Sequence, residues 1–247
     1  MIPQIELRDR ILVSEAKKEA VKRKVPLQGV GVFFNLNNPD EVLGVYPNLV
    51  VRDGREVTLR KLFNLPLPLD VTEAVFNRRK ICCFGVGSGG VANIGSGGVL
   101  DPFTVLEPTP ADSELNTRKP FITKTSSLTT QEAAKYLGGE VINGVGGAST
   151  YWYKKKFTGS PVITTVAAPN AEDAYNDDYY VRLQLDITTT EVRGELINEI
   201  AIYTGVDTTA SPGNFTNFKM FSRITFPTEY FATLGDKAIG INYYLYV

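Results

Sequence analysis

The second half of the chain carries apolar residues at every second position or in short runs, the pattern of β-strands. Along the first of these segments Arg182, Gln184 and Asp186 alternate with apolar residues, so one face of the strand is polar and the other apolar. The predicted strands are 179–187, 198–204, 218–226 and 238–247. A loop rich in Thr, Gly and Asp separates the last two, which predicts that they pair antiparallel and that the final segment is a core strand.

The N-terminal segment has a different spacing. Over 5–24, apolar residues recur at helical intervals among Glu, Lys and Arg, which predicts an amphipathic helix that ends at Val25 and Pro26. Two roles are open for it: packing on its own subunit, or docking on a neighbour as an assembly arm. The arm residues would be Ile5, Ile11, Leu12 and Ala16. We therefore divide the chain into a helical arm, 1–26, and a β-rich domain, 27–247.

The β-rich domain contains two further short helices and several irregular stretches. A helix is expected over 55–64, with Leu59, Leu62 and Phe63 on one face, and another over 129–137, capped by Thr129 or Thr130. Glycine and proline dominate 84–120 and glycine dominates 138–150, so the first is interpreted as an extended excursion and the second as a loop. The predicted fold is mainly β: an antiparallel β-sandwich with an N-terminal α-helix and long glycine-rich loops.

Composition excludes several chemistries. The chain has 247 residues, 26 basic and 27 acidic, and no histidine. The net charge of -1 does not suit a nucleic-acid partner, and the lack of histidine excludes imidazole catalysis and His-bearing zinc sites. No apolar run approaches the roughly 20 residues of a membrane helix. The adjacent Cys82 and Cys83 are interpreted as reduced strand residues, because vicinal cysteines rarely form a relaxed disulfide.

Gly85 to Gly90 match the dinucleotide-binding pattern G-x-G-x-x-G. The motif requires a helix directly after the glycines, whereas here more glycine and then Asp101-Pro102 follow. A phosphate-binding loop would also need a Gly-Lys-Ser/Thr sequence, which is missing. We therefore expect a bulged or flexible loop and no cofactor.

Aromatic and basic residues adjoin in one segment, which makes it the sharpest candidate for ligand binding. It consists of Tyr151, Trp152, Tyr153, Lys154, Lys155 and Lys156. Aromatic faces stack on sugars or bases while ammonium groups meet phosphates or carboxylates. The alternative, which we favour, is a strand with Trp152 in the core and the lysines solvated.

Two sets of acidic residues are weaker candidates. Glu172, Asp173, Asp177 and Asp178 carry oxygen ligands suited to calcium, but their spacing fits no calcium loop and favours a solvated acidic loop. Glu195 and Glu199 would be a carboxylate pair if they faced each other, as in a glycosidase. Solvated charges are the favoured interpretation of this pair as well.

Five phrases follow one another along the chain: VRDGREVTLRKLF (51–63), FGVGSGG (84–90), VLDPFTVLEP (99–108), NEIAIYTG (198–205) and the segment 218–247. Together they resemble a family of tailed-bacteriophage virion proteins of the tail, tail-fibre-associated and baseplate type. In that family a glycine-rich phrase precedes a variable excursion, and a strand containing F-x-R-I-T-F precedes a closing strand.

The resemblance implies a non-enzymatic structural component of the tail, baseplate or neck, assembled in the host cytoplasm. Its partners would be other virion proteins and copies of itself, with neither nucleic acid nor membrane. Two alternatives remain beside it: a carbohydrate- or receptor-binding module of a tail fibre, and a head decoration protein. The resemblance implies no catalytic residues.

Overall fold

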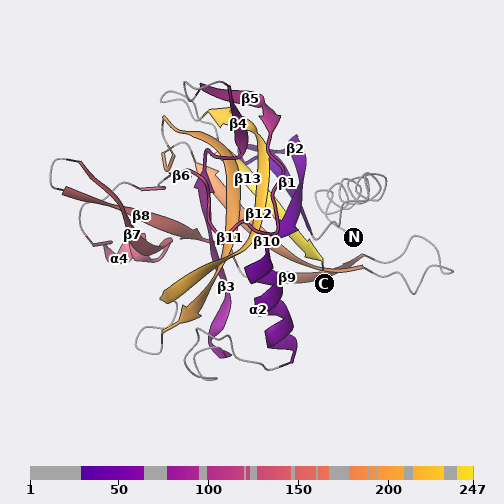
Figure 1. The fold of residues 1–247 in the computed structure, drawn as a ribbon. Helices are drawn as coiled ribbons and strands as arrows, with labels where there is room; N and C mark the ends of the chain where they lie inside the picture. The colour runs from indigo at the N-terminus through magenta and orange to yellow at the C-terminus, as the bar shows by residue number, and fades with distance from the viewer. Residues whose placement is uncertain are drawn as a thin grey trace. The chain divides into compact units, whose positions relative to one another are not determined.

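The structure is a computed structural model of the chain (Figure 1). It describes residues 29–63, 77–94, 99–119, 121–122, 127–145, 148–159, 161–166, 178–188, 190–192, 194–208, 214–230 and 238–246. The chain divides into two compact units. Unit 1 comprises 1–49, 157–189 and 235–247, and unit 2 comprises 50–156 and 190–234. The boundary predicted at residue 26, the arm residues Ile5, Ile11, Leu12 and Ala16, and the N-terminal helix lie outside the described residues.

Unit 1 is an antiparallel sheet with the strand order β2-β1-β13-β10-β9. Its strands are β1 (Gly29–Asn35), β2 (Asn38–Val50), β9 (Val162–Val166), β10 (Asp178–Thr188) and β13 (Ala238–Tyr246). The alternation predicted for β10 is confirmed, because Leu183, Leu185 and Ile187 are each no more than 1% exposed. Burial of these alternate side chains fixes which face of the strand packs on the core.

One predicted pairing is wrong. The segments 218–226 and 238–247 both form strands, but they do not pair with each other. Both edges of β13 are occupied, by β1 on one side and β10 on the other. Strand β12 (Phe215–Tyr230) instead pairs with β11 (Leu196–Asp207). The short loop between the two segments suggested a hairpin, but β13 pairs with strands distant from it in the sequence, whereas β12 pairs with the strand that precedes it.

Unit 2 is also antiparallel, with the strand order β7-β8-β3-β11-β12. Short β6 (Arg118–Lys119) pairs with β3 (Arg79–Gly87), and β4 (Val91–Ile94) and β5 (Val99–Val105) form a separate hairpin. Strands β7 (Tyr136–Val145) and β8 (Ala148–Lys156) form the hairpin at the edge. The glycine-rich stretch 138–150, interpreted above as a loop, is thus largely strand.

The core of unit 2 is built mainly from β3, β8, β11 and β12. Cys82 and Cys83 are free thiols in this core, as predicted. The sheet pairing shifts register here, with Tyr203 opposite Cys83 but Thr204 opposite Ile81, so Cys82 is the extra residue of a β-bulge. One buried hydrophobic cluster of this core consists of Val51, Cys82, Cys83, Leu115, Leu137, Trp152, Ala201, Tyr203 and Met220.

Two helices occur in the described part of the chain. Helix α2 (Arg52–Leu62) packs on β12 through Gly54, where a Cβ would lie 2.1 Å from the Phe221 carbonyl oxygen. The apolar face predicted for this helix is exposed instead: Leu59 is 58%, Leu62 74% and Phe63 65% accessible. The reason is that the small Gly54 permits close contact with β12 near the start of the helix, whereas the three large residues lie at its end.

Helix α4 (Thr130–Ala133) is shorter than predicted but begins where expected. Thr129 is its N-cap: the Thr129 hydroxyl oxygen accepts the Glu132 backbone N–H, and the Glu132 carboxylate accepts the Thr129 backbone N–H, which completes a capping box. No helix among the described residues is long and apolar enough to cross a membrane.

Taken over both units, the described architecture is mainly β and antiparallel, as predicted.

Candidate functional site

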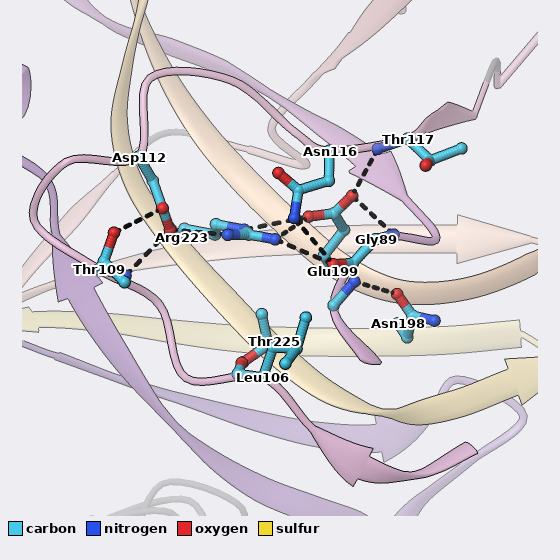
Figure 2. A network of polar contacts seen from close by, with 11 residues as sticks. Gly89, Leu106, Thr109, Asp112, Asn116, Thr117, Asn198, Glu199, Arg223 and Thr225 are labelled. Carbon is cyan, nitrogen blue, oxygen red and sulfur yellow. Dashed lines mark hydrogen bonds and ion pairs between the residues drawn. The ribbon is translucent and has the colours of Figure 1, made fainter. Parts of the chain in front are cut away.

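A buried polar cluster of unit 2 is centred on Arg223 and Glu199 (Figure 2). Arg223 lies on β12 and Glu199 on β11, two positions apart in the ladder, because Arg223 pairs with Ala201. Arg223 donates through Nε to Glu199 Oε2 at 3.0 Å, and Nη2 donates to the same oxygen. The side chains are 4% and 0% exposed, so this ion pair is inside the protein.

The other oxygen of Glu199 holds the glycine-rich bend, residues 88–90 after β3, in place. Glu199 Oε1 accepts the backbone N–H of Gly89 at 2.9 Å and that of Thr117 at 3.2 Å. The neighbouring Asn198 accepts the Gly90 N–H through Oδ1 at 2.6 Å. One carboxylate thus joins β12, the bend after β3 and the segment that leads into β6.

Asp112 connects the segment before β6 to the same arginine. Its Oδ2 accepts from Arg223 Nη1 at 2.7 Å and from the Thr109 backbone N–H at 3.0 Å. Farther along β12, Thr225 donates to the Leu106 carbonyl at 2.6 Å. Residues 106–117, which belong to the predicted excursion, are therefore attached to their own unit by side chains of β11 and β12.

The glycines of the bend are required by space. A Cβ on Gly89 would lie 2.2 Å from the Cβ of Asn116, and one on Gly90 would lie 2.2 Å from the carbonyl oxygen of Asn198. Both distances are far below ordinary contact, so a side chain would force these segments apart. The bend is followed by strand β4 rather than by the helix that a dinucleotide motif requires. The glycine pattern serves close packing of the backbone.

The ionisation of the cluster is set by its own members. Burial alone would raise the pKa of Asp112, but hydrogen bonds from Arg223 and Thr109 outweigh it and hold that pKa below its ordinary value. Burial alone would lower the pKa of Arg223, but Glu199 and Asp112 raise it above its ordinary value. Both shifts favour the charged forms of Asp112 and Arg223, so the attraction between these two groups is maintained near neutral pH.

This arrangement leaves Glu199 no free acceptor for a substrate proton. A carboxylate offers about four lone-pair sites, and Glu199 receives two N–H groups from Arg223 and two from the backbone. The candidate partner Glu195 is engaged elsewhere, in an ion pair with Lys119 at 2.6 Å. The cluster therefore holds chain segments together through ion pairs and hydrogen bonds.

The aromatic and basic segment 151–156 forms part of β8. Trp152 is 1% exposed and lies in the core, as the favoured interpretation predicted. Lys154 is also 1% exposed, contrary to the solvated lysines of that interpretation. Its Nζ lies 4.1 Å from the Trp152 ring centroid, 4.4 Å from that of Phe218 and 5.0 Å from that of Tyr203. These three rings attract the ammonium group through cation–π interactions.

The next lysine forms a second buried contact. Lys155 is 8% exposed, and its Nζ lies 2.7 Å from Glu191 Oε1, which also accepts the Tyr136 hydroxyl at 2.8 Å. Burial first, and then the charge of Glu191, raise the pKa of Tyr136. Tyr153 is 4% exposed and Lys156 is half-buried, with its Nζ donating to the Ala133 carbonyl. The side chain of Tyr151 lies outside the described residues.

The buried side chains of this segment are thus engaged inside the unit. Among the acidic residues considered for calcium, Glu172, Asp173 and Asp177 lie outside the described residues. In the described part of the chain no group of three or more Cys, Asp or Glu residues is arranged to hold a metal ion.

Arg223 and Asp112 did not emerge from the sequence as site residues. The available signal was a single charge inside an apolar strand, Arg223 within FSRITF and Glu199 within NEIAIY. A buried charge needs a partner, so two such strands suggest an ion pair. Comparison with known proteins finds no matching protein family, curated protein or solved structure.

Proposed function

We propose that the chain is a structural component of a tailed-phage virion, located in the tail, baseplate or neck, and that it acts through protein–protein assembly. In this proposal it has no catalytic activity, it is assembled in the host cytoplasm, and its partners are other virion proteins and copies of itself. Its sheets would be arranged as a β-sandwich with an N-terminal helix and glycine-rich loops.

The observation that carries the proposal is that several charged side chains of unit 2 form ion pairs and hydrogen bonds within the unit. Glu199, Arg223 and Asp112 bind one another and the backbone. Lys155 binds Glu191 and Lys119 binds Glu195. Groups committed in this way hold chain segments in place, which suits a scaffold better than an enzyme. The resemblance of the matching phrases to tail and baseplate proteins supports the proposed location in a virion.

Localisation in particles tests the proposal. An antibody against the purified chain is applied to gradient-purified virions from the strain that encodes it, and the particles are viewed by electron microscopy. Label at the tail, baseplate or neck is the expected result. Label over the capsid would support head decoration instead, and virions free of the chain by both labelling and immunoblot would overturn the proposal.

A further inference from the structure

Among the described residues, β7 of unit 2 pairs only with β8, and β9 of unit 1 pairs only with β10, so each forms one edge of its sheet. An edge strand offers a row of backbone N–H and C=O groups to another chain, and proteins commonly interrupt such edges with bulges or charges. The pairing of β7 with β8 shifts register twice, and β7 contains Glu140. Strand β7 therefore has both of these protections.

Strand β9 has neither protection. Its five residues, VITTV, pair with β10 in unbroken register from Val162 opposite Arg182 to Val166 opposite Asp178. No charged residue occurs from Phe157 to Ala171. Four of the five residues are Val or Thr and the fifth is Ile, so all are β-branched and suited to an extended strand.

The sequence of β9 is complementary to itself about its central residue. If two copies of β9 lie antiparallel with Thr164 opposite Thr164, Val162 faces Val166 and Ile163 faces Thr165. Cross-strand pairs of Thr with Thr and of β-branched residues are favourable, and this pairing opposes no like charges. Such a contact uses the same surface on both copies, as a two-fold dimer requires.

We propose that β9 is a self-association edge, at which a second copy of this chain adds its own β9 antiparallel and joins two unit 1 sheets into one. The occupant is a second copy because the edge is self-complementary and uncharged, and because a net charge of -1 gives two copies little repulsion. The inference deepens the proposed function, since it rests on an assembly protein present in several copies, and it names the surface by which copies meet.

A charge-swap experiment on the full chain tests this pairing. Light scattering over a dilution series is expected to show the wild type changing from a dimer to a 27.2 kDa single chain. Thr164→Lys places two ammonium groups opposite each other and is expected to raise the dimer dissociation constant about tenfold or more. An equal mixture of Thr164→Lys and Thr164→Glu is expected to recover the dimer, because opposite charges then meet.

Three further variants control the result. Thr164→Val keeps a β-branched, uncharged side chain and is expected to dimerise like the wild type. Val141→Lys puts the same charge on the other edge strand and is expected to leave the dimer intact. Thr164→Cys, treated with oxidised glutathione, is expected to form a disulfide-linked dimer on a non-reducing gel, whereas Val141→Cys is not.

A wild type that stays a single chain at every concentration would overturn the inference, as would a dimer that Thr164→Lys does not weaken. These outcomes are separate from those of the proposed function. A chain found in virion tails but monomeric in solution would contradict only the β9 pairing. A dimer sensitive to Thr164→Lys in a chain absent from virions would contradict only the virion assignment.

Discussion

Arg223 and Glu199 are diagonal neighbours on adjacent strands, and their side chains form an ion pair that is almost completely buried. The pair does more than join β11 to β12. Because the second Glu199 oxygen holds the backbone of Gly89 and Thr117, the two central strands also position the glycine-rich bend and the segment that precedes β6. Removing one partner therefore affects four segments at once.

Glu199→Gln is expected to lower the free energy of unfolding by about 3–5 kcal/mol, because it leaves the buried Arg223 charge without its main partner. Urea unfolding at neutral pH, followed by circular dichroism, measures this. The double variant Glu199→Met, Arg223→Met is the matched control. It removes both charges and is expected to lose less stability than the single variant. If Glu199→Gln were as stable as the wild type, the stabilising role of the Glu199–Arg223 ion pair would be contradicted.

Asp112 predicts how the stability of unit 2 depends on pH. Its folded pKa lies below the ordinary 3.8, so the unfolded chain binds more protons and stability rises with pH through this range. The stabilisation by Asp112 should be fully present above about pH 4 and disappear as the pH falls through the folded pKa. Urea unfolding of wild type and Asp112→Asn should therefore differ most above that pH and converge in stronger acid. A difference independent of pH would contradict this role.

Gly89→Ala tests the packing of the bend. The new Cβ would lie 2.2 Å from that of Asn116, so one segment must move, at a cost of about 1–3 kcal/mol in the free energy of unfolding. Asn116→Gly removes the opposing Cβ and should restore part of the loss when combined with Gly89→Ala. Two losses in urea midpoint are compared: the loss that Gly89→Ala causes in the wild-type chain, and the loss that it causes in a chain that already carries Asn116→Gly. Equal losses in both backgrounds would show that this contact is not the cause.

Local sequence patterns predicted which segments form strands better than they predicted which strands pair with each other. The alternation of Leu183, Leu185 and Ile187 identified β10, and the Thr129 and Glu132 pair identified the start of α4. These signals depend on side chains close together in the sequence. Pairing depends on distant segments, so a short loop before β13 wrongly suggested a hairpin with β12.

The buried cluster shows the same division. The single charges of Glu199 and Arg223 inside apolar strands are visible in the sequence. Their partnership requires the β11–β12 register, and Asp112 lies far from both in the chain. The lysines beside Trp152 were misplaced for a related reason. Three consecutive lysines usually indicate solvent, but the aromatic rings around Lys154 come from β8, β11 and β12, which only the fold brings together.

A double-mutant cycle tests whether the rings stabilise Lys154. Lys154→Met keeps much of the length without the charge, and Phe218→Leu removes one ring. If the ammonium–ring contact of 4.4 Å stabilises unit 2, the cycle should give a coupling free energy of about 1–2 kcal/mol in urea unfolding. Lys154→Met with Leu62→Ala is the control, because Leu62 is exposed on α2. Additive effects in the Phe218 cycle would contradict the interaction.

Deletion of residues 1–24 separates folding from assembly. All described strands begin after this segment, so the truncated chain should retain the far-ultraviolet circular dichroism of β-structure and a cooperative unfolding transition. If the apolar residues at helical spacing bind neighbours in the virion, the truncated chain should be missing from particles when it replaces the wild type during infection.

A point variant distinguishes loss of the arm's apolar contacts from loss of length. Ile11→Asp with Leu12→Asp keeps all residues but places charges on the predicted apolar stripe, and it should be excluded from virions like the deletion, because burying an unpaired carboxylate at an interface is costly. Lys17→Gln, on the opposite side of the predicted helix from Ile11 and Leu12, should be incorporated normally. Immunoblots of gradient-purified particles compare the three. Normal incorporation of the deletion would refute the arm, while exclusion of Lys17→Gln together with the others would assign the role to charge rather than to the apolar stripe.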